Sequence, residues 1–247
     1  MPVTVVVPYR NRGPQLAQLL PVLQSHPDIA HIHVCEDVGA GPFNRGWVKN
    51  VGFLQARELR PDSTVYFHDV DLLPGRLLYP DATPGGVVHL YGHPHCLGGI
   101  VGMRAADFDS VGGFAEDHVL WGGEDRRLRM ACAGLAIEGP YCARFACDAT
   151  VREMDPAGRP LPGRVARRLF ARELQSRQKV PPQLEPRCPE RGDLASTAYA
   201  LVEVRELEGQ RTTVHRVRAC GPLDICGRRS HVAASFSQSP KNGGSRK

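Results

Sequence analysis

The first half of the chain alternates between strand patterns and helical patterns, beginning with a continuous β-branched run, Val3–Val7. Runs that are apolar on both faces are typical of strands buried inside a sheet. The helical patterns are Gln15–Gln24, with a kink expected at Pro21, and Arg45–Arg57. Further strand patterns are Ala30–Val34, Thr64–Phe67 and Val87–Leu90. This order predicts an α/β fold with a mixed, mostly parallel sheet flanked by helices.

The second half of the chain carries shorter patterns. They predict, in order, a short helix over Ala105–Val111, a helix over Glu124–Ala133, and a hairpin of Ala198–Glu206 with Arg211–Ala219. Gly134 is expected to cap the second of these helices. The polar end, Ser235–Lys247, predicts disorder. We expect one domain over residues 1–220 and a partly disordered tail over residues 221–247.

Composition limits the classes of protein to which the chain can belong. At 247 residues and 42% apolar content it can bury a core, and its net charge of +5 is mild. A basic cluster from Arg159 to Lys179 is interpreted as a solvated helix face, because it lacks the interleaved aromatics of a nucleic-acid patch. An acidic glycan or protein acceptor is the third interpretation of this cluster.

No stretch approaches the roughly 20 apolar residues of a membrane span, and a signal peptide before the first strand is not expected. The eight cysteines form no C-x-x-C pairs, so a structural zinc site is not expected. Their even number permits disulfides without showing them. Cys35 and Cys132 lie within apolar patterns and are expected to be buried thiols.

The segment Val65–Pro74 carries the chemistry most clearly. Its apolar run ends in Asp69 and Asp71, which an extended chain would place on the same side. Two hard oxygen ligands at the carboxyl end of a strand suit a divalent cation that holds a diphosphate, and ligands of open α/β sheets bind at that end. A solvated Asp-rich turn is the alternative. Arg10 and Arg12 follow the first strand, where they could grip phosphates or form surface salt bridges.

Six segments in this order resemble the β-1,4-galactosyltransferase family. They read VTVVVPYRNR, FNRGWVKNVGF, FHDVDLLP, GGIVGMRAADFDSVGG, WGGEDRR and, more distantly, GDLASTAYAL. FHDVDLLP is most similar to the branch that galactosylates xylose on proteoglycan core proteins. The resemblance implies a GT-A fold, UDP-galactose as donor, Mn²⁺ as cofactor with Mg²⁺ as a substitute, and inversion at the transferred sugar.

The resemblance assigns roles to residues. Donor-binding positions are Pro8, Tyr9, Arg10, Arg12, Phe43, Arg45, Asp69, Val70 and Trp121. Asp71 matches the metal-ligating aspartate, Asp69 the residue that contacts the ribose, and Val70 is expected to point into the core or lie beneath the uridine. Trp121, Gly122, Gly123 and Glu124 match the mobile loop that contacts the acceptor, and Asp125 matches the catalytic base.

Three departures from the family pattern matter. Val119 and Leu120 stand in place of the first Trp and Gly of the W-G-W-G-G-E-D loop. The metal-ligating histidine is missing, and Glu153 or Met154 is expected to replace it unless both are ordinary loop residues; His93 and His95 are expected to be loop residues. Cys96 occupies the place of a large aromatic, which could relax donor choice toward UDP-GalNAc unless Leu97 or His95 refills the space.

The expected partners are a UDP-sugar and a glycan or glycoprotein acceptor, with no nucleic acid and no membrane span. The compartment is cytoplasmic if the chain is intact and the Golgi lumen if it is a fragment of an anchored protein. Two other classes stay open. One is a non-catalytic sugar-binding relative, which the missing histidine favours, and the other is a metal-dependent phosphohydrolase built on Asp69 and Asp71.

Overall fold

The computed structural model describes residues 2–117, 123–146, 148–177, 197, 199–207 and 211–219. Its longer inner strands are β1 (Val3–Tyr9), β2 (Ile29–Asp37), β3 (Thr64–His68), β5 (Gly86–Gly92) and β6 (Ile100–Arg104). The remaining strands are β4 (Leu72–Pro74), β7 (Ala136–Glu138), β8 (Cys142–Ala143), β9 (Val151–Glu153), β10 (Tyr199–Glu206) and β11 (Thr212–Ala219). The helices are α1 (Gly13–Ser25), α2 (Arg45–Leu59), α3 (Ala105–Val111), α4 (Gly123–Ala131) and α5 (Gly163–Arg177), with a 3₁₀ turn at Cys132–Gly134.

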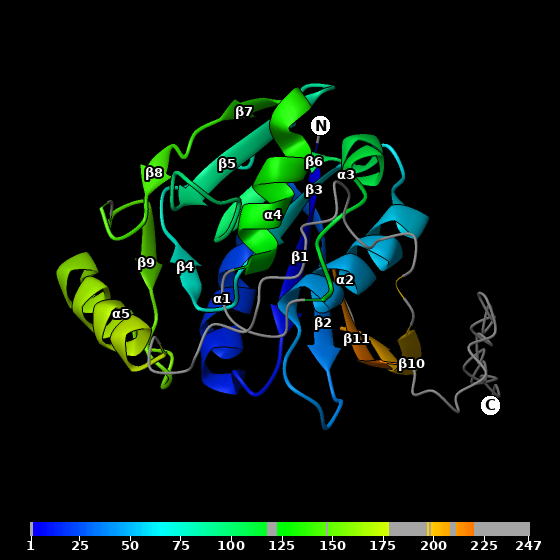
Figure 1. Ribbon diagram of the computed structural model, residues 1–247. Helices are drawn as coiled ribbons and strands as arrows, with labels where there is room; N and C mark the ends of the chain where they lie inside the picture. Colours follow the sequence, from blue (N-terminus) through cyan, green and yellow to red (C-terminus); the bar gives the residue numbers. More distant parts are fainter. Residues whose placement is uncertain are drawn as a thin grey trace, which may run out of the picture.

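One mixed sheet runs through the molecule in the order β10-β11-β2-β1-β3-β6-β5-β7, with β8 also paired to β5 (Figure 1). Strands β11, β2, β1 and β3 are parallel neighbours, whereas β6 is antiparallel to both β3 and β5. Strands β4 and β9 form a separate two-stranded ribbon. The predicted α/β fold, with a mixed, mostly parallel sheet flanked by helices, is confirmed.

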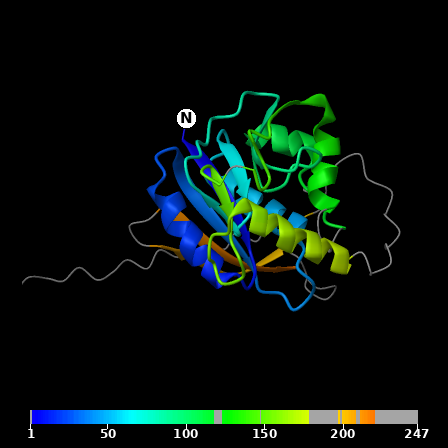
Figure 2. The same cartoon turned by 90° about the vertical axis from the view of Figure 1, so that its left-hand side faces the viewer.

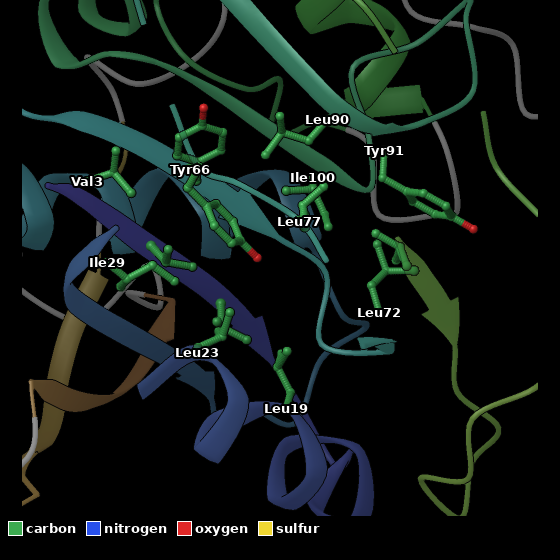
Figure 3. Close-up of a cluster of buried hydrophobic side chains, with 14 of the residues drawn as sticks. Val3, Leu19, Leu23, Ile29, Tyr66, Leu72, Leu77, Leu90, Tyr91 and Ile100 are labelled. Carbon is green, nitrogen blue, oxygen red and sulfur yellow. The ribbon is translucent and has the colours of Figure 1, made fainter. Parts of the chain in front are cut away.

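Strand β1 lies in the middle of this core because both of its faces are apolar. Val3, Val5 and Val7 share one cluster with Leu19 and Leu23 of α1, part of which Figure 3 shows. The opposite face of β1 packs against helix α2. A Cβ placed on Gly52 of α2 would lie 2.4 Å from Cγ1 of Val6, so the glycine lets helix and strand approach closely.

The predicted elements of the first half are all present, and α1 runs through Pro21; the kink expected there stays a prediction. The C-terminal hairpin is confirmed, because β10 and β11 pair antiparallel. Strand β6 was not anticipated, since its sequence contains Gly102, a weak strand former. A Cβ at Gly102 would lie 2.4 Å from the Tyr66 ring, so this glycine makes room for an aromatic neighbour.

The prediction that Gly134 caps a helix was wrong. Helix α4 ends at Ala131, and Gly134 lies within the 3₁₀ turn without the positive φ that glycine caps adopt. The expected buried thiols at Cys35 and Cys132 are confirmed as free, buried cysteines. Among the described residues, no helix combines the length and apolar character needed to cross a membrane.

The basic cluster after Arg159 forms helix α5, on the outside of the molecule in Figure 2. Its residues Arg164, Arg167, Arg168 and Arg172 are exposed, which agrees with a solvated helix face; the choice among the three interpretations stays a prediction. The expected tail lies outside the described residues, so its disorder and the domain boundary at residue 220 stay predictions.

Histidines stack between strands β2 and β11. Nδ1 of His33 lies 2.9 Å from Nε2 of His215, and the two rings stack with their centroids 5.1 Å apart. Burial, aided by the neighbouring His215, lowers the pKa of His33 to about 2. Burial likewise lowers the pKa of His215 to about 4. Both rings are therefore neutral in the folded protein at neutral pH.

The buried histidines predict a protein that loses stability in mild acid. The unfolded chain takes up protons on these rings below pH ~6.5, whereas the folded chain does not until well below that pH, so stability is full above pH ~6.5 and falls as the pH falls. We expect a loss of about 1–2 kcal/mol per histidine between pH 7 and pH 5. Urea unfolding at both pH values would measure it. An unchanged pH dependence in the His33→Gln/His215→Gln variant would contradict this origin.

Candidate active site

The D-V-D motif lies on a turn between β3 and β4 rather than along an extended strand. The backbone N–H of Leu72 donates to the carbonyl of Asp69 across this turn (3.2 Å), and the N–H of Asp69 donates to the carbonyl of Gly99 (3.0 Å). Val70 is 8% exposed and belongs to the apolar cluster, which agrees with the expectation that it points into the core. The expectation of a plainly extended D-V-D segment was wrong, because the chain reverses here.

The two aspartates of the turn differ in their electrostatic surroundings. Burial raises the pKa of Asp71 to about 6, with further contributions from the carboxylates of Asp69 and Glu153. Burial opposes ionisation of Asp69 as well, but the positive charges of Lys49, Arg45 and Arg144 lower the pKa of Asp69 overall. Of the two aspartates, Asp71 is thus the one whose negative charge is less compensated by protein groups. A bound cation would supply that compensation.

Pairing of β4 with β9 brings both predicted replacements for the missing histidine to Asp71. Leu72 is in register with Glu153, and the N–H of Met154 donates to the carbonyl of Asp71 (2.7 Å). The Glu153 carboxylate already accepts from Arg144 Nε (2.7 Å), Arg144 Nη2 (3.2 Å) and the Tyr91 hydroxyl (3.2 Å). The Met154 side chain is buried in the apolar cluster. Within the described ranges, no three His, Cys, Asp or Glu side chains are placed to hold a metal ion.

The two arginines after β1 have different surroundings. Arg10 forms an ion pair with Asp37, donates to the carbonyl of Gly41 (2.5 Å) and lies 5.2 Å from the centre of the Phe43 ring. Arg10 therefore ties the end of β1 to the segment before α2, and the salt-bridge interpretation describes its contacts. Arg12 is exposed at the start of α1. Pro8 and Tyr9 end β1 beside Cys35 and Glu36.

Helix α2 begins next to the acidic end of α4. Asn44 caps α2 by accepting from the N–H of Trp47 (3.0 Å), and the next residue, Arg45, lies 2.7 Å from Oε1 of Glu124. Glu124 is 1% exposed. Burial and the adjacent Asp125 raise the pKa of Glu124 to about 7, against the opposing charge of Arg45. The structure thus joins two predicted site residues, the partly exposed Arg45 and the buried Glu124, in an ion pair.

Asp125 lies one residue further along α4 and is also buried. Its Oδ1 accepts from Nζ of Lys49 (2.9 Å), and its backbone carbonyl accepts from the N–H of Leu97 (3.0 Å). Nζ of Lys49 is also 3.7 Å from Oδ1 of Asp69. The turn with the two aspartates and the acids of α4 therefore meet across one lysine. Trp121 and Gly122 lie outside the described residues, whereas Gly123 begins α4.

Sequence reasoning missed Lys49 and Arg144, the two cations that contact these carboxylates. The spacing of Arg45 and Lys49 could have pointed to the first, because residues four apart lie on the same face of a helix. Nothing in the sequence near Arg144 indicates its partner Glu153, which follows nine residues later on another strand. His93 and His95 are exposed loop residues, as expected.

The described residues have the GT-A fold of nucleotide-sugar transferases. The catalytic domain of Drosophila β1,4-galactosyltransferase 7, solved with xylobiose, superposes with a TM-score of 0.64 over 91% of this chain and 96% of that domain, at 22% identity. A mutant of the same enzyme in complex with manganese, UDP-Gal and xylobiose gives the same TM-score at 24% identity. Residues 1–79 match the N-terminal region of glycosyl transferase group 7, and residues 89–148 match the N-terminal domain of galactosyltransferase.

The chain belongs to the β-1,4-galactosyltransferase family. It is 32% identical to human β-1,4-galactosyltransferase 5 and 34% identical to rat β-1,4-galactosyltransferase 6, each over 154 residues and 56% of this chain. The matched region covers 40% of each of these relatives, so the chain matches less than half of their length.

Proposed function

We propose that this protein is an inverting glycosyltransferase that moves galactose from UDP-galactose to a sugar hydroxyl in β-1,4 linkage. One observation carries the proposal: the fold brings the Asp69–Asp71 turn and the acidic pair Glu124 and Asp125 together across Lys49. The family supports the same activity, and a structural neighbour was solved with manganese, UDP-Gal and xylobiose. A glycan or glycoprotein is the proposed acceptor, with a xylose-containing glycan as the first candidate.

In this mechanism, Asp125 removes the proton from the acceptor hydroxyl while the oxygen attacks the anomeric carbon from the face opposite UDP. A carboxylate suits this role because it is ionised near neutral pH and is held in one position. Glu124, fixed by Arg45, orients the acceptor sugar. The bond to the diphosphate breaks as the new bond forms, so the configuration inverts in one displacement.

A divalent cation fits the D-V-D turn, because Asp71 is a half-buried carboxylate whose ionisation the neighbouring acids oppose. Asp71 would hold Mn²⁺, with Glu153 as a second oxygen donor if Arg144 releases it, or Met154 as the alternative. Bound there, the metal would neutralise charge on the departing diphosphate. Asp69 would contact the ribose of the donor, whereas Val70 packs into the apolar core. The other proposed donor contacts are Pro8, Tyr9, Arg10, Arg12, Phe43 and Trp121.

A donor-by-acceptor array with manganese and with magnesium tests the proposal. Transfer from UDP-galactose to a xyloside or another sugar, dependent on metal and retained after purification, would support it. Binding of a sugar without any turnover would favour the non-catalytic relative, which the lack of a metal-ligating histidine suggests. Release of UDP at the same rate with and without acceptor would instead favour a hydrolase.

The small side chain of Cys96 predicts that the enzyme uses UDP-GalNAc as well as UDP-galactose. The residue is half-buried and lies close enough to Asp125 for that charge to act on its thiol, whose pKa is raised mainly by burial. Leu97 is buried in the core and His95 is exposed, so both have other environments in this structure. We expect Cys96→Tyr to lower the ratio of UDP-GalNAc to UDP-galactose use at least about fivefold, because the ring would refill the space of an N-acetyl group.

The same two donors should be compared in wild type and Cys96→Tyr at equal acceptor concentration. Cys132→Ser offers a control at a thiol buried elsewhere in the core. A donor ratio that does not fall on adding the tyrosine would show that Cys96 does not set donor choice.

A further inference from the structure

Helix α2 places a fully buried lysine beneath the candidate site. Lys49 is 1% exposed, and its ammonium lies 2.9 Å from Oδ1 of Asp125 and 3.7 Å from Oδ1 of Asp69. An ammonium taken out of water costs several kcal/mol unless it is paired. The two carboxylates supply that pairing, one from each side of the site.

The third neighbour of this ammonium is an aromatic face that is itself held in place. Nζ of Lys49 lies 4.7 Å from the centre of the Phe114 ring, within the range of cation–π attraction. The Asn50 side chain donates to the carbonyl of Phe114 and accepts from its N–H, each at 2.9 Å. One turn of α2 therefore fixes both the lysine and the ring beneath it.

Contacts on both of its oxygens fix the carboxylate of Asp125. Oδ1 accepts from the ammonium, and Oδ2 lies against Gly98, where an added Cβ would be only 2.2 Å away. Oδ2 therefore occupies the space that a side chain at residue 98 would take. A base with one oxygen held by an ammonium and the other packed against a glycine has a single orientation toward a reacting hydroxyl.

We propose that Lys49 is a positioning residue that fixes Asp125 as the base and ties it to the donor-side Asp69. This inference rests on the proposed function. It assigns to Lys49 no contact with either substrate, since the side chain is buried. Its role is to keep the base and the donor turn in one geometry, and its loss acts on turnover more than on donor affinity.

The test compares Lys49→Met, which keeps length and removes charge, with Arg57→Met. Arg57 lies two turns further along α2 and pairs with Asp109 at the surface, so it is a matched ion-pair control away from the site. We expect Lys49→Met to lower kcat at least about tenfold with the affinity for UDP and metal within about threefold of wild type. Arg57→Met should leave kcat and the affinity for UDP and metal within about twofold of wild type.

Stability provides a second readout if Lys49→Met folds poorly. Removal of the Lys49 ammonium leaves the buried carboxylate of Asp125 without its partner. Adding Asp125→Asn should therefore recover part of the lost Tm or restore folding. If Asp125→Asn does not reduce the fall in Tm caused by Lys49→Met, the inference is overturned. Wild-type kcat in Lys49→Met would also overturn it, as would kcat and UDP affinity falling together. If wild type transfers no sugar to any acceptor, the proposed function fails first and the role of Lys49 fails with it; an active wild type with an active Lys49→Met overturns only the lysine's role.

Discussion

Replacing Asp125 by Asn is expected to lower transfer about a hundredfold or more while leaving donor binding intact. The amide has the shape of the carboxylate but cannot take the proton of the acceptor hydroxyl. The adjacent Glu124 is a poor substitute, because it is 1% exposed and Arg45 engages its carboxylate. Turnover with saturating donor and acceptor, together with calorimetry of UDP and manganese, would separate lost chemistry from lost binding.

Two matched variants sharpen this experiment. Asp109→Asn removes an exposed acid that pairs with Arg57 away from the site, and we expect near-wild-type transfer from it. Glu124→Gln should raise the KM for acceptor, since this residue is proposed to orient the acceptor sugar. Near-wild-type turnover in Asp125→Asn would exclude Asp125 as the base, whatever its position in the fold.

Replacing Asp71 by Ala is expected to abolish metal-dependent binding of UDP. Asp71 is the carboxylate proposed to hold the cation that neutralises the diphosphate. Its raised pKa means that its ionised form opposes folding at neutral pH, so its removal should not lower Tm through lost charge pairing. Calorimetry of UDP with manganese, and again after chelation, would measure the effect. Equal UDP affinity in wild type with and without metal would rule out this site.

The identity of the second metal ligand can be tested in the same assay. If Glu153 is the ligand, all-oxygen coordination should shift preference toward magnesium, and Glu153→Gln should weaken metal-dependent UDP binding. If Met154 is the ligand, Met154→Leu should weaken it instead, with the packing of the apolar cluster retained. If metal-dependent UDP binding is unchanged in both variants, neither residue is a ligand, and Asp71 and the diphosphate of UDP hold the metal between them.

Much of the fold could be predicted from local patterns. Val3–Val7 is a continuous β-branched run and forms the inner strand β1, and the 3.6-residue pattern of Arg45–Arg57 forms α2. Strand β6 could not be predicted in this way, because its glycine is favourable only where the Tyr66 ring needs the space. Strand β9 is short and gains its place only through pairing with β4.

The sequence by itself determined the α/β class, the family and the acids that carry the proposed chemistry, because strand periodicity and ordered motifs are local properties of the chain. Only the tertiary structure decided which charges meet. Asp69 and Asp125 lie far apart in sequence, and Lys49 from a third element joins them. The same holds for Arg10, which pairs with Asp37, and for Arg144, which pairs with Glu153. The partner of a buried charge depends on distance in space and on the exclusion of water, and both arise only when the sheet and helices pack together.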